Sequence, residues 1–321
     1  MKMVQPCFAD ISILNKAAGD PLRLEVLRVL AQDSYGVLEL CEIFQYKQSG
    51  MSHHLKVLAE AELVAKRREG NSIFYSRAVP NATKGLMFLQ QQLYVTIDAI
   101  EMSDVMQQRL QQVKEGRTNA SQQFFVQQAD KFKAHQDLIA EYPAYGDAVA
   151  ELLRKTLPSS DAVAVEVGPG AGEFLPVLAT HFQQVIALDN APTMLTQAEQ
   201  YCVQQGVSNI EFVHGDTSFL VATDLSVNCV VMNMVLHHTP SPADIFTDIA
   251  AGLQKGGVLL ITDLCRHDQD WAKNACGDVW LGFDAGELQR WASLAGLQQG
   301  HSNYLALRNG FQIQLQQFTK M

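Results

Sequence analysis

Apolar residues recur at helical spacing through the first sixty residues, which predicts a series of short helices. Asp20 and Pro21 predict a helix start, because aspartate caps free N–H groups and proline fits the first helical position. Further helices are expected at about 37–45 and 48–59. In the second of these, three apolar residues at steps of four and three must face inward: Met51, Leu55 and Leu58.

The opposite face of the 48–59 helix carries only small polar or weakly basic side chains, namely Gln48, Ser49, Ser52, His53 and Lys56. Such side chains suit base edges in a DNA major groove, although any solvated helix presents a similar face. The following residues favour the DNA interpretation. A hairpin with a Gly70-Asn71 turn is predicted over 63–76, and three successive cations lie at its base: Lys66, Arg67 and Arg68. A helix-turn-helix followed by a basic hairpin is a winged helix.

The charge distribution supports the same assignment. The chain has a formal net charge of −10, yet residues 1–113 carry twelve basic and twelve acidic residues, so that the excess lies in residues 114–321. Residues 45–80 contain six basic and three acidic residues. This local positive excess marks the surface expected to meet a polyanion, here double-stranded DNA.

Three stretches between residues 8 and 80 resemble the ArsR/SmtB family of winged-helix repressors: Asp20–Leu27, Gln48–Leu58 and Ala61–Gly70. The resemblance implies a homodimer that binds a twofold operator. Many members sense metals through a Cys-x-Cys pair, but the corresponding positions here hold Glu39 and Cys41, and no histidine occurs between 81 and 113. Metal sensing by this domain is therefore not expected.

From about residue 160, short apolar runs alternate with helical segments. The runs at 163–167, 185–188, 210–213, 227–232 and 258–262 predict strands of a parallel sheet. This alternation indicates a doubly wound α/β domain with helices on both faces and ligands at the carboxyl ends of the strands. Two final strands, near 302–307 and 311–318, are expected to form an antiparallel edge.

The first strand ends at Glu166 and runs into a loop with Gly168, Gly170 and Gly172. Glu173 occupies the place of the third glycine of a dinucleotide fingerprint and would oppose a pyrophosphate, so a cationic or phosphate-free ligand fits better. A plain tight turn is the alternative. The pattern resembles motif I of the class I S-adenosylmethionine (SAM) dependent methyltransferases.

That resemblance covers about residues 160–265 and implies a pocket for SAM or S-adenosylhomocysteine (SAH). Asp189 ends the second strand, where a carboxylate binds ribose hydroxyls. The family pattern places Asp216 at the adenine amino group and Glu166 near the methionine ammonium. His237 and His238 are weak candidates for a catalytic base. The alternative is that one bonds a backbone carbonyl while the other lines the pocket.

The expected organisation has three parts. Residues 1–113 form a winged-helix DNA-binding and dimerisation domain, 114–158 a linker and helical lid, and 159–321 the methyltransferase-like domain. Residues 114–119, which include Gly116 and Asn119, are the most linker-like stretch and mark the expected boundary. Tyr142 and Tyr145 in the lid either reach the ligand or belong to the core.

No apolar run approaches the roughly 18 residues of a membrane span, and the N-terminus lacks a basic region followed by an apolar one, so a cytoplasmic protein is expected. The six cysteines are scattered, with no short Cys/His spacing that would close a zinc site. No metal site is predicted.

These patterns favour a dimeric transcriptional regulator whose DNA affinity is set by SAM or SAH. By analogy with fused members of the family, methionine-cycle genes are the expected targets. The alternative is an active methyltransferase of a small molecule whose winged helix serves autoregulation. Arsenite methylation is a third reading, but only Cys265 and Cys276 form a plausible thiol pair for it.

Overall fold

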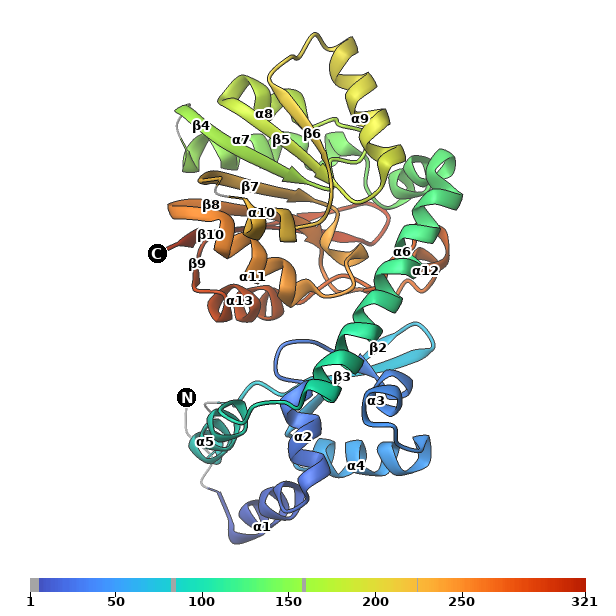
Figure 1. The fold of residues 1–321 in the computed structure, drawn as a ribbon, viewed down its shortest axis with the longest axis vertical. Coiled ribbons are helices and arrows are strands. Elements are labelled where there is room, and N and C mark those ends of the chain that lie inside the picture. The colour runs from blue at the N-terminus through green and yellow to red at the C-terminus, as the bar shows by residue number, and fades with distance from the viewer. Residues whose placement is uncertain (1–5, 82–84, 158–159, 224) are drawn as a thin grey trace. The chain divides into compact units, whose positions relative to one another are not determined.

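The computed structural model describes residues 6–81, 85–157, 160–223 and 225–321 (Figure 1). The chain divides into two compact units, Met1–Arg117 and Thr118–Met321. The boundary expected at 158/159 falls on two residues outside the described ranges. Among the described helices, none combines the length and apolar character needed to cross a membrane.

The first unit is a winged helix, as predicted. Its elements are α1 (Phe8–Ala18), α2 (Pro21–Val29), β1 (Tyr35–Gly36), α3 (Val37–Phe44), α4 (Gln48–Glu60), β2 (Val64–Glu69), β3 (Ser72–Arg77), α5 (Met87–Asp98) and the start of α6 (Asp104–Ile139). The Asp20 side chain caps α2 by accepting from the Arg23 N–H. Strands β2 and β3 pair antiparallel around the Gly70-Asn71 turn, and β1 pairs with β3.

The stretch expected to be a linker is helical. α6 runs from Asp104 to Ile139 without interruption, so that the first unit ends and the second begins within one helix. Tertiary contacts account for the difference. The Arg117 guanidinium donates to both carboxylate oxygens of Glu39 at 2.6 Å and lies over the Tyr35 ring at 5.0 Å. These contacts hold the helix where Gly116 weakens its intrinsic propensity.

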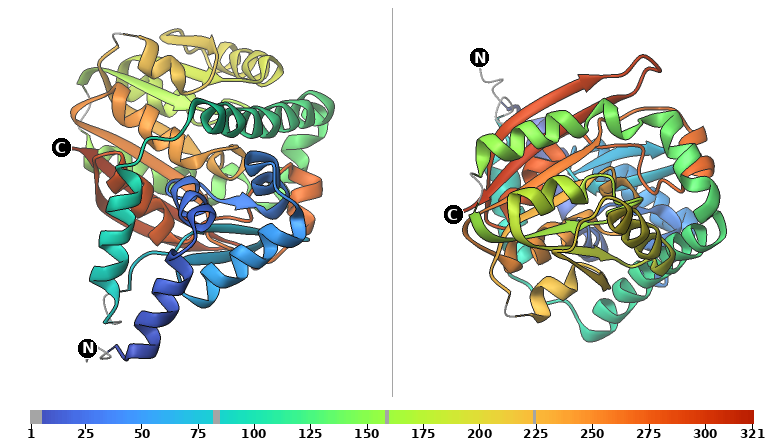
Figure 2. Two further views of the ribbon diagram at one scale, coloured as in Figure 1. Left: turned by 60° about the horizontal axis from the view of Figure 1, so that its bottom comes forward. Right: turned by 90° about the horizontal axis from the view of Figure 1, so that it is seen from above.

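The second unit is built on a seven-stranded sheet in the order β6-β5-β4-β7-β8-β10-β9. Its strands are β4 (Ser160–Val167), β5 (Phe182–Asp189), β6 (Ile210–His214), β7 (Val227–Asn233), β8 (Leu253–Leu264), β9 (Leu297–Ala306) and β10 (Gln312–Lys320). The first five are parallel, and β10 runs antiparallel to both of its neighbours. The predicted parallel sheet with an antiparallel edge is confirmed (Figure 2).

Helices cover both faces of this sheet, as the doubly wound fold requires (Figures 1 and 2). They are η1 (Tyr142–Ala144), α7 (Gly146–Thr156), α8 (Leu175–His181), α9 (Pro192–Gln204), α10 (Ser218–Ala222), η2 (Leu236–His238), α11 (Pro242–Gly252), α12 (Trp271–Cys276) and α13 (Ala285–Leu294). The strand order reverses between β4 and β7, where doubly wound sheets open a ligand crevice.

Candidate functional site

The exposed face of α4 is polar throughout. Three apolar residues of the helix, Met51, Leu55 and Leu58, are fully buried in the core of the first unit. All five residues predicted to read DNA are exposed: Gln48, Ser49, Ser52, His53 and Lys56. The inward and outward faces of α4 are therefore arranged as the helical period predicts.

The wing differs from expectation at Arg67. Arg67 is 6% exposed and forms an ion pair with Glu69, which is 1% exposed, whereas Lys66 and Arg68 are exposed. Alternate residues of a strand point to opposite faces, so the middle cation of the three points away from the outer two. Arg67 thus belongs to the interior of the winged helix, and Lys66 and Arg68 are the cations of β2 that remain for phosphate.

The glycine loop leaves β4 in a backbone conformation that favours glycine. Gly168, Gly170 and Gly172 all have positive φ, at 67°, 56° and 86°. A Cβ on Gly168 would come within 2.6 Å of Val235, and one on Gly172 within 3.0 Å of Ala198, whereas one on Gly170 would meet nothing within 4 Å. The loop is packed at both ends and open at its centre, which leaves room for a ligand against the backbone.

Glu166 lies beneath this loop in an unfavourable environment for a carboxylate. It is 1% exposed, and burial raises its pKa to about 8, which the hydrogen bond from Asn233 Nδ2 at 3.3 Å only partly opposes. Its second oxygen, Oε2, has no hydrogen-bond partner among the described residues. Buried polar atoms are normally satisfied, so this oxygen is available to a cationic or hydrogen-bond-donating group.

We expect Glu166→Gln to remove a pH dependence from the stability of the second unit. The folded pKa of about 8 exceeds the unfolded value near 4.3, so the proton stabilises the fold below pH ~4 and this stabilisation is lost as the pH rises to about 8. Relative to wild type, the variant should gain about 4 kcal/mol between about pH 5 and pH 8.5. Chemical unfolding followed by tryptophan fluorescence measures this gain, since Trp271, Trp280 and Trp291 all lie in the second unit.

Glu211→Gln provides the control, because it removes an exposed carboxylate from β6, at the edge of the same sheet. The difference in unfolding free energy between Glu166→Gln and wild type should therefore change between about pH 5 and about pH 8.5. An equal difference at these two pH values would contradict the raised pKa of Glu166.

The other two predicted ligand carboxylates lie at the same edge of the sheet. Asp189 ends β5 and accepts from the Ala191 N–H at 2.8 Å, and burial raises its pKa to about 6. Asp216 follows β6 and is exposed. It accepts from the N–H and the hydroxyl of Ser218, at 3.0 and 2.5 Å, at the start of α10. The structure therefore brings both to the carboxyl ends of the parallel strands, and Asp216 also has a local capping role.

The second half of α6 covers this edge. Lys133 forms an ion pair with Glu173 of the glycine loop at 3.0 Å, and Phe124 packs against Ala191 and Met194 at the start of α9. Glu173 precedes α8 rather than lying within its first turn. α6 thus contacts the residues that follow both β4 and β5, as a lid over their ends would.

Tyr142 and Tyr145 lie between the lid and the sheet. Their rings meet edge to face at 5.7 Å, and Tyr145 belongs to the core while Tyr142 is half-buried against it. Burial, with a smaller contribution from the nearby Glu166 carboxylate, raises the pKa of Tyr142 to about 12 and that of Tyr145 further. Both phenols therefore stay protonated at neutral pH and keep an O–H group that can donate a hydrogen bond.

The two candidate histidines are buried in η2, after β7. His237 Nδ1 lies 2.9 Å from Asp263 Oδ1, and His238 Nδ1 lies 3.4 Å from the Gly277 carbonyl. Burial lowers the pKa of His237, but the Asp263 and Asp278 carboxylates outweigh it and raise the pKa to about 9. Burial and the neighbouring imidazole hold the pKa of His238 well below its usual value.

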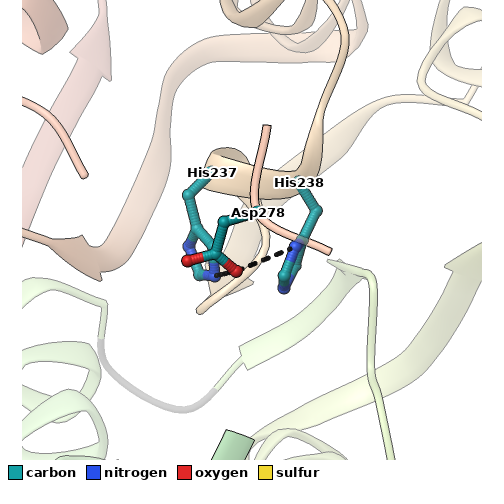
Figure 3. Close-up of side chains that lie close together, drawn as sticks. All are labelled: His237, His238 and Asp278. Carbon is teal, nitrogen blue, oxygen red and sulfur yellow. Dashed lines mark ion pairs between the residues drawn. The ribbon is translucent and has the colours of Figure 1, made fainter. Parts of the chain in front are cut away.

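The alternative interpretation is that one histidine bonds a backbone carbonyl while the other lines the pocket. Its first part matches His238, which faces the Gly277 carbonyl. His237, however, pairs with the carboxylate of Asp263. Sequence reasoning missed Asp278, which lies close to both imidazoles (Figure 3). No sequence motif links positions 237 and 278.

Two family models match the chain. Residues 20–66 match that of the bacterial regulatory proteins of the arsR family, and residues 165–261 match that of a methyltransferase domain. The two matches fall on the winged helix and on the glycine-loop half of the sheet, respectively.

Several curated proteins are similar to parts of the chain. An arsenical resistance operon repressor of Staphylococcus xylosus is 38% identical over 21% of this chain and 65% of its own length. The transcriptional repressor SdpR of Bacillus subtilis is 34% identical over 19% of this chain and 68% of its own length. An arsenite methyltransferase of Halobacterium salinarum is 32% identical over 26% of this chain and 21% of its own length. The chain thus spans less than two thirds of the first of these relatives and about a fifth of the last.

Among solved structures, one described as a putative methyltransferase from Bacillus halodurans matches 54% of this chain and 99% of its own length, at 16% identity and a TM-score of 0.48.

Proposed function

Because the first unit belongs to the ArsR family of bacterial regulatory proteins and the second is a methyltransferase domain, we propose that the chain is a DNA-binding transcriptional regulator controlled by SAM or SAH. In this proposal the second unit binds the nucleoside and the winged helix binds the operator. Occupancy of the first site changes the affinity of the second. The targets we propose are genes of the methionine cycle, since these set the supply of both nucleosides.

The observation that carries the ligand assignment is Glu166. A fully buried carboxylate with one oxygen lacking a partner suits the ammonium of a methionine moiety, which would supply both charge and hydrogen bond. The open centre of the loop at Gly170 accommodates the chain of the ligand. Asp189, at the end of the adjacent strand, suits the ribose hydroxyls, and Asp216 the adenine amino group.

SAM and SAH differ in one charge. SAM carries a sulfonium cation that SAH lacks, and the edge of the sheet presents several carboxylates, including Glu166, Glu173 and Asp189. These acidic groups give a physical basis for distinguishing the two nucleosides, because a bound cation favours their ionised forms.

The winged helix offers a compact surface for DNA. The α4 face of Gln48, Ser49, Ser52, His53 and Lys56 fits a major groove, with Lys66 and Arg68 of β2 placed for phosphate. Arg77 is not part of this surface, because its guanidinium is buried and forms a two-point ion pair with Asp98.

We further propose that the chain acts as a homodimer. Large apolar side chains are exposed on the two terminal helices of the winged helix, with Phe8 of α1 93% exposed and Phe88 and Val95 of α5 71% and 63% exposed. Both helices pack against α2, and exposed apolar side chains of this size are typical of subunit interfaces. A second copy of the winged helix would cover them and supply the second recognition helix.

Helix α6 provides the physical connection between ligand and DNA. Its first half belongs to the winged helix, where Leu110 and Val113 lie in the core and Arg117 pairs with Glu39. Its second half carries Phe124 and Lys133, which contact the residues around the glycine loop. We propose that a ligand that shifts the second half of α6 acts on the first half through this helix.

Methyl transfer to a small molecule is the competing function. It requires a base in line with the transferred methyl group. Both candidate bases, His237 and His238, are buried and face a carboxylate and a backbone carbonyl, respectively. The structure gives no specific support for turnover, which methyl-labelled SAM with a pool of metabolites would reveal.

Charge-reducing substitutions test the proposed DNA surface. We expect Lys66→Ala with Arg68→Ala to weaken binding to a DNA duplex selected from a random library, and to make log K against log salt shallower by about 1.8, because two phosphate contacts are lost. A fluorescence anisotropy titration at several salt concentrations measures both quantities. Arg154→Ala with Lys155→Ala removes the same charge from exposed positions of α7 and should leave the slope unchanged. An unaltered slope in the wing variant would refute the assigned surface.

A further inference from the structure

A second polar cluster lies beside the nucleoside pocket and has no role in the function proposed above. His237 and His238 in η2 and Asp278 after α12 are 1%, 6% and 4% exposed. One potential metal-ligating atom from each lies within 4.8 Å of the others. Figure 3 shows the carboxylate of Asp278 directed between the two imidazole rings.

The separations suit a shared ion. His237 Nε2 lies 3.8 Å and His238 Nδ1 3.6 Å from the same oxygen, Asp278 Oδ1. Metal–ligand bonds of about 2.0–2.2 Å put tetrahedral ligand atoms about 3.3–3.6 Å apart. All three ligand atoms lie within 4.8 Å of one another, so coordination requires an inward movement of the side chains in which His238 Nδ1 turns from the Gly277 carbonyl to the ion.

The outer contacts orient His237 as a ligand. Its Nδ1 faces Asp263 Oδ1 at 2.9 Å, and the same carboxylate accepts from the His237 and Leu264 N–H groups. Histidines that bind metals commonly donate the second ring N–H to a carboxylate, which fixes the tautomer and directs the other nitrogen at the ion. Here that other nitrogen, Nε2, is the one that faces Asp278.

The backbone joins the two ligand-bearing segments. The His237 carbonyl accepts from the N–H groups of Val279 and Trp280, both at 3.0 Å, and the Trp280 indole donates to the Thr239 carbonyl at 2.8 Å. Positions 238 and 278 are thus held together although forty residues separate them. Such preorganisation lowers the cost of forming a binding site.

The charges of the cluster also match a dication. Two buried carboxylates, Asp263 at 0% and Asp278 at 4% exposure, flank two imidazoles. Buried charge is costly unless compensated, and a divalent ion bound by these side chains would compensate both carboxylates. Imidazole with carboxylate is a ligand set used for zinc and other first-row transition metals.

We propose that His237, His238 and Asp278 bind a divalent first-row transition metal ion, with Asp263 as a positioning residue for His237. Three protein ligands leave at least one coordination position for water or another small ligand. Ser121 of α6 contacts the His238 carbonyl at 3.4 Å, so the ion would stabilise the segment on which the lid helix rests.

Cobalt and zinc titrations of the full chain, stripped of metal and equilibrated overnight, test this site. We expect one Co²⁺ per chain with visible d–d absorption, displaced by Zn²⁺, and a melting temperature that Zn²⁺ raises and a chelator restores. Asp278→Asn and His238→Gln should each weaken Co²⁺ binding by at least about 100-fold, and Asp263→Asn by about 10–100-fold.

His301→Gln, at an exposed position of β9, is the matched control and should bind Co²⁺ as wild type does. Circular dichroism establishes that each variant is folded, and two ligand variants are used so that one remains if the other fails to fold. Absence of the d–d band in wild type, or unchanged Co²⁺ affinity in the folded ligand variants, would overturn the proposal. Neither result bears on nucleoside or DNA binding, which are measured separately.

Discussion

The substitution Gly170→Arg is expected to abolish SAM and SAH binding, with an affinity loss of at least about 100-fold. A Cβ at Gly170 meets nothing within 4 Å, so the chain can fold around the new residue. Its long side chain would then fill the space that the loop leaves open and bring a second cation to the site of the ligand ammonium. The backbone cost of a side chain at φ 56° is about 1–2 kcal/mol, well below what would unfold the domain. Isothermal titration calorimetry measures the loss directly.

Gly206→Arg is a matched control for this experiment. Gly206 also has positive φ, at 70°, and open space around its Cβ position, but it lies in the turn between α9 and β6, at the opposite edge of the sheet from the glycine loop. The control carries the same backbone strain and the same added charge. Nucleoside binding that survives in Gly170→Arg, or disappears equally in Gly206→Arg, would contradict the pocket assignment.

Loss of the Arg67 side chain is expected to lower the stability of the winged helix rather than to remove a DNA contact. We expect Arg67→Ala to destabilise the winged helix by about 3–5 kcal/mol, because it leaves the buried Glu69 carboxylate without its guanidinium. Amide hydrogen exchange of β2 and β3 measures the loss within the first unit. Lys66→Ala, at the adjacent exposed position, should change the same exchange rates by less than about 0.5 kcal/mol.

A double variant separates burial from charge. Arg67→Met with Glu69→Leu removes both charges and should recover most of the stability lost in Arg67→Ala, since apolar replacement of a buried pair is often close to neutral. Equal destabilisation by Lys66→Ala and Arg67→Ala would show that the pair is not buried in solution.

The architecture could be predicted because its signals are local. Apolar spacing gave α3, α4 and the wing, and the change from helical spacing to short apolar runs marked the parallel strands. Asp20 with Pro21 marked the start of α2, and the three glycines marked the loop after β4. Both signals can be read from the sequence because they depend on the backbone conformation of those residues and not on distant contacts.

What the sequence did not reveal depends on tertiary contact. Arg67 was counted among the DNA cations, although strand alternation already places it on the face of Glu69 and opposite Lys66 and Arg68. The helix through residues 114–119 is held by Arg117, whose partner Glu39 is far away in the chain. The grouping of His238 with Asp278 likewise arises only from the fold.

The central claim is that nucleoside binding changes DNA affinity, and the most direct test is to titrate the protein onto a selected DNA duplex with and without saturating SAM or SAH. We predict that at least one nucleoside changes the affinity by about 5-fold or more, and that DNA changes the affinity for that nucleoside by the same factor, because coupling is reciprocal. Gly170→Arg should bind the duplex but show no response. Tight binding of both nucleosides with unchanged DNA affinity would contradict the account.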